Sequence, residues 1–244
     1  MDFIFMLTRD DRTVTDCLDV LDAVRDLGVV HLGFKDVGVE PATLDRLHRQ
    51  IKDMGATSYL EVVSTTREEA LTSVRRAVDL GVDRLMGGTW IDETLELVAG
   101  TSVAYLPFVG EPLGHPTRLA GGPDRITDDC LRAEAAGCAG VDLLAYRATD
   151  ADPLDLVRAA RAATTGSLVV AGGISSTERI RAVAAAGADA FTIGSAAFDG
   201  SLRPRAGTLA AQLGAALEAV ASGPAPSPRL HGDGQSPAPH TLVP

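Results

Sequence analysis

The sequence predicts an α/β protein in which residues 1–221 form a single (β/α)8 TIM barrel. Two observations indicate this fold. Short apolar runs alternate with helical patterns eight times along the chain, and the runs are almost continuously apolar, as expected for parallel strands that are buried on both faces. An open doubly wound sheet is the alternative, because counting strand–helix units does not prove that a sheet closes.

The expected strands lie, in chain order, at residues 3–7, 29–34, 58–63, 84–86, 103–106, 141–145, 168–170 and 190–193. Helices fill the intervals, and a last helix over 207–221 completes the outer ring. Four helices begin at capping signals, which are Glu40-Pro41, Thr65 with Glu68, Asp152-Pro153, and Ser175 with Glu178. The aspartates of three recurring junctions are interpreted as structural groups at strand starts: Gly81-Val-Asp, Gly140-Val-Asp and Gly187-Ala-Asp.

Composition excludes several kinds of protein. The net charge is −11 and no run of Lys or Arg is longer than Arg75-Arg76, which argues against a nucleic-acid surface. No apolar run approaches the length of a membrane span. Three cysteines at no metal-ligand spacing, with the first strand beginning near Met1, lead us to expect a cytoplasmic protein without a signal peptide. Residues 222–244, dominated by Pro, Ser, Gly and His, are expected to be disordered.

The last two expected strands are each followed by residues with little or no side chain, at Gly172-Gly173 and at Gly194-Ser195. The carboxyl ends of neighbouring parallel strands meet at one face of a barrel, so the amide N–H groups of both segments can converge on one anion. The alternative is that these glycines only permit tight turns. Two such pairs at consecutive strand ends favour a phosphate-binding site.

These segments carry a resemblance to a known family. Residues 168–200, with Ala171-Gly-Gly-Ile-Ser175 and Ile193-Gly-Ser-Ala196, resemble the seventh and eighth strand–loop units of the ribulose-phosphate-binding barrel superfamily. That superfamily includes indole-glycerol-phosphate synthase, phosphoribosylanthranilate isomerase and the phosphoribosyl isomerases of histidine biosynthesis. The resemblance implies that the substrate phosphate is held by Gly172, Gly173, Ser175, Gly194 and Ser195. The same segments also resemble the FMN-phosphate site of flavin-dependent barrels.

The rest of the chain departs from those families. The histidine-pathway isomerases use acidic residues on strands one and five and a second glycine-rich phosphate site on the third and fourth units. Here the fifth expected strand ends in Pro107-Phe108 and the third in Val63-Ser64. Gly87-Gly88 alone is a weak trace of a second site. The resemblance therefore indicates a superfamily and not an activity.

Lys35 and Glu61 are the first candidates for catalysis. Strand alternation puts Lys35 on the side opposite Leu32 and Phe34, so it should face the barrel interior at the mouth. Glu61 on the neighbouring strand could come within ion-pair distance. Of 22 basic residues only Lys35 and Lys52 are lysine. Arginine would serve poorly where a group must lose a proton, although Lys35 could equally form a simple ion pair with Glu61 or Asp36.

Three further residues are candidates with open alternatives. Asp36 faces away from the interior by alternation unless its loop turns it inward, and it could instead contact a helix. His115 lies in the longest loop, 108–124, which has the length of a lid, and it could be a proton shuttle or a surface residue. Arg147 could bind an anionic group or stabilise an enolate, or it could pair with Asp150 or Asp152.

Together these residues suggest an enzyme that moves a proton next to the carbonyl of a small phosphorylated sugar or sugar acid. It would be an isomerase or epimerase, or a lyase in which Lys35 forms an imine. The alternatives are an FMN-dependent enzyme and a barrel that only binds a phosphometabolite. No cofactor is expected, a need for Mg²⁺ is left open, and FMN is disfavoured because the short chain has no insertion to cover its ring. Nucleic acid and membranes are not expected as partners, and homo-oligomerisation is left open.

Overall fold

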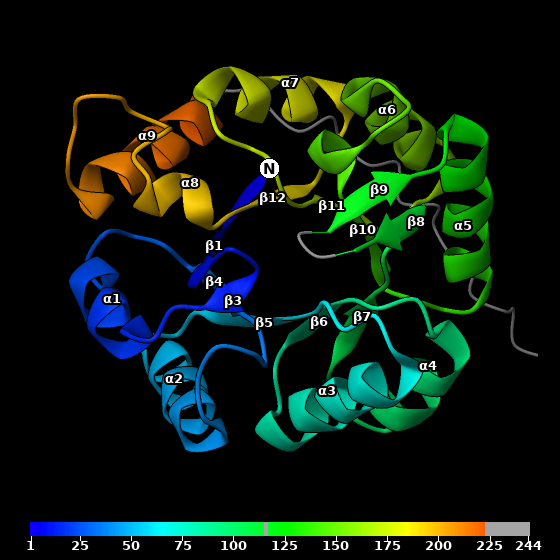
Figure 1. Cartoon of the computed structure of the whole chain (residues 1–244), viewed down its shortest axis with the longest axis horizontal. Coiled ribbons are helices and arrows are strands. Elements are labelled where there is room, and N and C mark those ends of the chain that lie inside the picture. The colour runs from blue at the N-terminus through cyan, green and yellow to red at the C-terminus, as the bar shows by residue number, and fades with distance from the viewer. Residues whose placement is uncertain (115–116, 223–244) are drawn as a thin grey trace, which may run out of the picture.

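A computed structural model describes residues 1–114 and 117–222. Its main sheet has eight parallel strands in the order β10-β11-β12-β1-β4-β5-β6-β7, surrounded by helices (Figure 1). The strands are β1 (Asp2–Met6), β4 (His31–Phe34), β5 (Thr57–Val62), β6 (Arg84–Gly87), β7 (Ala104–Leu106), β10 (Gly140–Leu143), β11 (Ser167–Val170) and β12 (Ala190–Ile193). Every expected strand is present, and the predicted TIM barrel is confirmed.

The barrel closes at a seam between the two edge strands β7 and β10. There the backbone of Asp142 donates to the Pro107 carbonyl at 2.8 Å and accepts from the Val109 amide at 3.1 Å, and the Ala139 amide donates to Tyr105 at 2.9 Å. A single parallel bridge, Phe108 to Asp142, marks this junction. The open doubly wound sheet is thereby excluded.

The helices on the outside are α1 (Cys17–Val24), α2 (Pro41–Asp53), α3 (Arg67–Leu80), α4 (Ile91–Val98), α5 (Pro123–Ala135), α6 (Pro153–Ala163), α7 (Thr177–Ala186) and α9 (Leu209–Ala221). Two short turns, η1 (Ala145–Arg147) and α8 (Ser195–Phe198), follow strands β10 and β12 at the strands' carboxyl ends. The expected starts at Glu40-Pro41 and Asp152-Pro153 are confirmed, since Glu40 and Asp152 are the N-caps of α2 and α6.

The other two capping signals were placed one residue too early. The side chain of Thr66, not Thr65, caps α3 by accepting from the Glu69 amide, and Ser176, not Ser175, caps α7 by accepting from the Arg179 amide. Each site contains two adjacent hydroxyl residues, and either could satisfy the exposed amides of the first turn. The shift places Ser175 outside the helix, in the loop after β11.

Side chains from the strands pack on two sides. Along β1, Phe3, Phe5 and Leu7 belong to the large apolar core between strands and helices, whereas Ile4 and Met6 point into the barrel. The interior cluster comprises Ile4, Met6, Tyr59, Met86, Leu106, Val169 and Ala190. This cluster fills the middle of the barrel interior with an apolar layer. Polar groups lie on both sides of the layer, toward the carboxyl ends and toward the amino ends of the strands.

Two small hairpins extend from the carboxyl ends of strands, and the sequence did not predict them. The first pairs β2 (Thr8–Arg9) with β3 (Arg12–Thr13), and the second pairs β8 (Glu111–Leu113) with β9 (Arg118–Ala120) within the loop 108–124. Of the tail expected over 222–244, Ser222 is ordered as the C-cap of α9, and residues 223–244 lie outside the described residues. Within the described part of the chain, every helix is too short or too polar to cross a lipid bilayer.

Candidate active site

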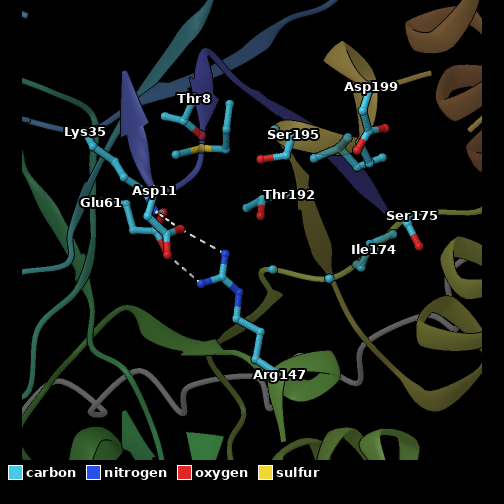
Figure 2. A pocket seen from close by; sticks show the side chains of 16 residues that line it. Thr8, Asp11, Lys35, Glu61, Arg147, Ile174, Ser175, Thr192, Ser195 and Asp199 are labelled. Carbon is cyan, nitrogen blue, oxygen red and sulfur yellow. Dashed lines mark hydrogen bonds and ion pairs between the residues drawn. The ribbon is translucent and has the colours of Figure 1, made fainter. Parts of the chain in front are cut away.

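A cavity of about 190 Å³ opens at the carboxyl ends of the strands. Its walls come from β1, β4, β5 and β12, from the first hairpin, and from the loops after β10, β11 and β12 (Figure 2). Lys35, Glu61, Asp11 and Arg147 gather on one side, while Ser175, Ser195 and Asp199 lie on the other (Figure 2). The cavity therefore has a charged side and a side made largely of backbone and hydroxyl groups.

Lys35 stands between two carboxylates. Its Nζ is 2.8 Å from Asp11 Oδ1 and 3.1 Å from Glu61 Oε2, and all three side chains are at least nine-tenths buried. The predicted approach of Lys35 and Glu61 is confirmed. The backbone of Lys35 is fixed by Thr13 of β3, whose hydroxyl both donates to the Lys35 carbonyl at 2.6 Å and accepts from its amide at 2.9 Å.

Arg147, which lies in η1, forms an ion pair with the carboxylate of Asp11 as well. Its two terminal nitrogens lie 2.8 Å and 2.9 Å from the two oxygens of Asp11 (Figure 2). It also donates to the Thr117 carbonyl at 3.2 Å. The expected alternative, pairing with Asp150 or Asp152, is wrong, because the guanidinium turns inward to a buried acid instead of outward to the surface.

The cations decide the charge state of Asp11. Burial alone would raise its pKa, but hydrogen bonds and charge from Arg147 and Lys35 outweigh burial and bring the pKa below its usual range. Asp11 is therefore an anion that organises two cations, and it is poorly suited to accept a proton. Glu61 is the other carboxylate beside Lys35, with its Oε2 3.1 Å from Nζ.

Asp142 is a second acid inside the barrel. It is completely buried on β10, and neither of its carboxyl oxygens has a hydrogen-bond partner within the described residues. Burial raises its pKa well above the ordinary value, and the neighbouring charge of Glu61 raises it further. The surroundings of Asp142 therefore favour the protonated acid, although the charges of Lys35 and Arg147 act in the opposite direction.

The loop after β11 exposes its backbone to the cavity. Gly172 and Gly173 have φ of +69° and +72°, which other residues rarely adopt. Arg179 of α7 holds this loop by donating to the Gly173 carbonyl, and its guanidinium lies 4.5 Å from the centre of the Tyr146 ring. In the described chain, no backbone acceptor receives a hydrogen bond from the five predicted phosphate-binding amides, those of Gly172, Gly173, Ser175, Gly194 and Ser195.

Close packing also fixes the position of the segment Gly194-Ser195 after β12. A Cβ at Gly194 would lie 2.7 Å from the carbonyl oxygen of Thr8 and 2.7 Å from its hydroxyl oxygen. The hydroxyl of Ser195 accepts from the Asp10 amide at 3.2 Å, which ties this segment to the first hairpin. All five predicted phosphate-binding residues line the cavity.

Two predicted site residues are not among the cavity residues. Asp36 turns outward, where it accepts a hydrogen bond from Ser73 of α3, and burial raises its pKa although that bond lowers it. The structure thus gives Asp36 the helix contact that was its alternative. His115 lies outside the described residues. Lys35, Glu61 and Arg147 are brought together.

Sequence reasoning missed Asp11 and misread Asp142. The segment Thr8-Arg-Asp-Asp-Arg-Thr13 has the form of a hairpin with a two-residue turn, and Asp10 and Asp11 have φ of +50° and +59°. That pattern could have indicated Asp11. Asp142 shares a Gly-x-Asp pattern with the two structural aspartates Asp83 and Asp189. Strand β10 begins at Gly140, however, so the side chain of Asp142 lies within the strand and faces inward.

The other two aspartates of that repeat are structural, as expected. Asp83 binds Lys52 at 2.7 Å and the Ser58 amide at 2.8 Å, and Asp189 binds Arg161 at 2.7 Å. Within residues 1–114 and 117–222, no group of three or more His, Cys, Asp or Glu side chains is arranged to hold a metal ion.

Fold and cavity together define a (β/α)8 barrel with a charged cavity at the carboxyl ends of the strands. Comparison with known proteins agrees with the resemblance seen in the sequence. Residues 116–205 match the family model described as histidine biosynthesis protein, a segment that contains both glycine-rich strand ends. No curated protein matches the chain significantly.

Solved structures share the fold at low sequence identity. The tryptophan synthase alpha-subunit of Pyrococcus furiosus has a TM-score of 0.64 at 14% identity, covering 89% of this chain and 98% of that one. Native KDPGal gives 0.63 at 16% identity, covering 91% and 97%. Orotidine 5'-phosphate decarboxylase of Pyrococcus horikoshii OT3 gives 0.60 at 12% identity, covering 88% and 99%. At these identities the likeness establishes the fold alone.

Proposed function

We propose that this chain is an enzyme that binds a small phosphorylated sugar or sugar acid and transfers a proton next to its carbonyl group. The observation that carries the proposal is that one cavity brings together five uncommitted backbone amides and four charged residues. Several structural neighbours are enzymes by name, which supports catalysis in general.

The phosphate would bind to the amides of Gly172, Gly173 and Ser175 and of Gly194 and Ser195. Amide N–H groups without a protein acceptor are suited to an anion, and phosphate oxygens supply the missing acceptors. The family match over 116–205 includes these residues and supports this assignment. The cavity of about 190 Å³ suits a short carbon chain beyond the phosphate.

Glu61 would be the base. Only its Oε2 is engaged by Lys35, at 3.1 Å, so Oε1 has no partner within the described residues and can face a substrate C–H. Lys35 has three N–H donors, one of which is donated to Asp11 while Glu61 is held as an ion pair, so a further N–H can stabilise an oxygen that gains negative charge. Arg147, held by Asp11, adds positive charge on the same side.

The test uses deuterium exchange, which detects proton transfer at a carbon whatever product is formed. The protein is screened by thermal shift against phosphate esters, including dihydroxyacetone phosphate and ribulose 5-phosphate, because a ligand of the folded state raises the melting temperature. Esters that bind are then incubated in D2O and followed by NMR. We expect deuterium at the carbon next to the carbonyl, with Glu61→Gln losing exchange at least 100-fold while binding persists. Absence of any binding ester would refute the proposal.

The lyase form of the proposal, with an imine on Lys35, has its own test. An imine requires a free amine that can reach the substrate carbonyl, whereas Lys35 Nζ is engaged by the carboxylates of Asp11 and Glu61. We therefore expect that borohydride, added with a binding ester, leaves the mass of the protein unchanged. A substrate-dependent mass increase that disappears in Lys35→Met would instead establish the imine.

A flavin enzyme is the second candidate, favoured by one structural neighbour. A mandelate oxidase mutant with an FMN adduct gives a TM-score of 0.60 at 19% identity, covering 89% of this chain and 71% of that one. A cavity of about 190 Å³ is below the range of about 300–1,000 Å³ that larger ligands occupy. An absorbance band of flavin in the purified protein, or its appearance on adding FMN, would favour this candidate.

A barrel that only binds a phosphometabolite is distinguished by the same variants. In that case Glu61→Gln and Lys35→Met would bind the ester as the wild type does, and no deuterium would enter the ligand with any of the three proteins.

A further inference from the structure

A second and larger cavity opens at the opposite end of the barrel. Its volume is about 340 Å³, and it is lined by the first residues of several strands, among them Asp2, His31, Thr57, Arg84 and Ser167. Leu106, Val169 and Ala190 form an apolar floor. These three belong to the interior cluster that also includes Met6, a wall residue of the first cavity, so an apolar layer separates the two cavities.

The rim of this second cavity carries the cation Arg84 beside the carboxylates of Asp2 and Asp189. Arg84 donates only to the Asp83 carbonyl, at 3.2 Å, and forms no ion pair with a carboxylate in the described part of the chain. The hydroxyls of Thr57 and Ser167 likewise have no hydrogen-bond partner within the described residues. Asp189 is already bound by Arg161 at 2.7 Å and by the Leu168 amide at 2.9 Å.

His31 adds another donor. Its Nδ1 lies 3.1 Å from the Tyr59 hydroxyl. Burial raises the pKa of Tyr59 to about 12, so that hydroxyl keeps its proton and can donate a hydrogen bond to Nδ1. Burial lowers the pKa of His31, and the neutral tautomer that accepts at Nδ1 has its N–H at Nε2. Nε2 is 3.7 Å from Asp2, too far for a hydrogen bond.

An apolar floor beside a guanidinium that has no carboxylate partner in the described part of the chain matches one class of ligand. We propose that this amino-end cavity binds a small organic monocarboxylate, with the carboxylate against Arg84 and His31 and its apolar group on Leu106, Val169 and Ala190. Arginine recognises carboxylate through two parallel hydrogen bonds, which an amide or alcohol cannot reproduce. The site is independent of the phosphate-binding cavity.

The test uses sodium benzoate with benzamide as its neutral isostere. We expect benzoate to raise the melting temperature in a saturable way and to bind at least tenfold more tightly than benzamide in isothermal titration calorimetry. In methyl NMR spectra, benzoate should shift the signals of Leu106 and Val169 and leave Ile174 and Ile193, at the other cavity, unchanged.

Arg84→Met removes the cation from an exposed position and should weaken benzoate binding at least tenfold, without changing the affinity for benzamide. Arg181→Met, an exposed change on α7, is the matched control and should bind benzoate as the wild type does. Equal affinity for benzoate and benzamide, an unchanged affinity in Arg84→Met, or shifts confined to Ile174 and Ile193 would each overturn the proposal. None of these outcomes depends on the chemistry assigned to the first cavity.

Discussion

Asp11 and Arg147 are 136 residues apart in the chain and form a two-pronged ion pair, with nitrogen–oxygen distances of 2.8 Å and 2.9 Å. The side chain of Asp11 is only 4% exposed, and the same carboxylate also holds Lys35. The first hairpin and the turn after β10 are therefore joined through one buried acid. Two cations depend on it for their position.

Asp11→Asn should destabilise the fold, because it leaves Lys35 and Arg147 buried without their shared anion. Loss of one partner from a buried ion pair costs about 3 kcal/mol in the free energy of unfolding. Urea denaturation measures the change. The control is Asp10→Asn, at the neighbouring turn position, where φ is also positive but the side chain is exposed. Equal effects of the two substitutions would contradict the role given to Asp11.

Gly194→Ala tests the close packing of the proposed phosphate-binding segment. The added Cβ would meet the Thr8 carbonyl oxygen at 2.7 Å, and backbone cannot move aside as a flexible side chain can. We expect affinity for phosphate esters to fall at least tenfold in calorimetry. Gly207→Ala is the control, because a Cβ there has no atom within 4 Å. A variant at Gly194 that binds as tightly as the control would argue against this segment.

Asp142 makes stability depend on pH. Its pKa is raised in the folded state, so the folded protein holds a proton that the unfolded chain releases above about pH 4. This contribution to stability is fully present below the unfolded pKa and is lost as pH rises toward the folded pKa. Asp11 acts in the opposite direction, because its pKa is lowered and its contribution is lost in acid.

The difference between the wild type and Asp142→Asn isolates this effect. The free energy of unfolding of Asp142→Asn should improve relative to the wild type as pH rises from 4 to 8, measured by urea denaturation at each pH. Asp53→Asn, an exposed change at the end of α2, should give a difference that does not vary with pH. A pH-independent difference for Asp142→Asn would mean that the acid is ionised in the folded protein.

Asp36→Asn should separate structure from binding. Asp36 contacts Ser73 of α3 and does not reach the cavity, so the variant should lose about 1–3 kcal/mol of stability and keep its affinity for phosphate esters. Ser73→Ala should cause a similar loss, and the double variant should lose less than the sum. Weakened ester binding in Asp36→Asn, with binding intact in Ser73→Ala, would contradict this prediction and show that Asp36 contributes to ligand binding.

The sequence was sufficient where a regular rule applies along a strand. Alternation placed Leu32 and Phe34 in the outer core and Lys35 in the interior, and the register of β4 and β5 then brought Lys35 to Glu61. The segments Gly172-Gly173 and Gly194-Ser195 at two strand ends, together with the family resemblance, indicated five residues that line the cavity. The strand features follow from local periodicity and the loop residues from short local motifs, so neither required knowledge of distant contacts.

The missed features depend on turns and on strand starts, which no periodicity fixes. Asp11 reaches the cavity because a two-residue turn reverses the chain after β1. Asp142 lies within β10 because that strand begins at Gly140, and a start three residues later would have made it an end group like Asp83, which directly precedes β6. The partner of Arg147 could not be predicted, because nearer acids such as Asp150 competed with one on a hairpin that was not recognised.

The seam between β7 and β10 has a consequence for how the barrel opens. One isolated bridge joins these edges, whereas four registered pairs join β10 to β11. Local opening starts where the fewest hydrogen bonds must break together. The amide protons of Val109, Ala139 and Asp142 should therefore exchange with solvent deuterium earlier than those of β11 and β12. Local opening of the barrel at this seam would expose the carboxyl group of Asp142 to water.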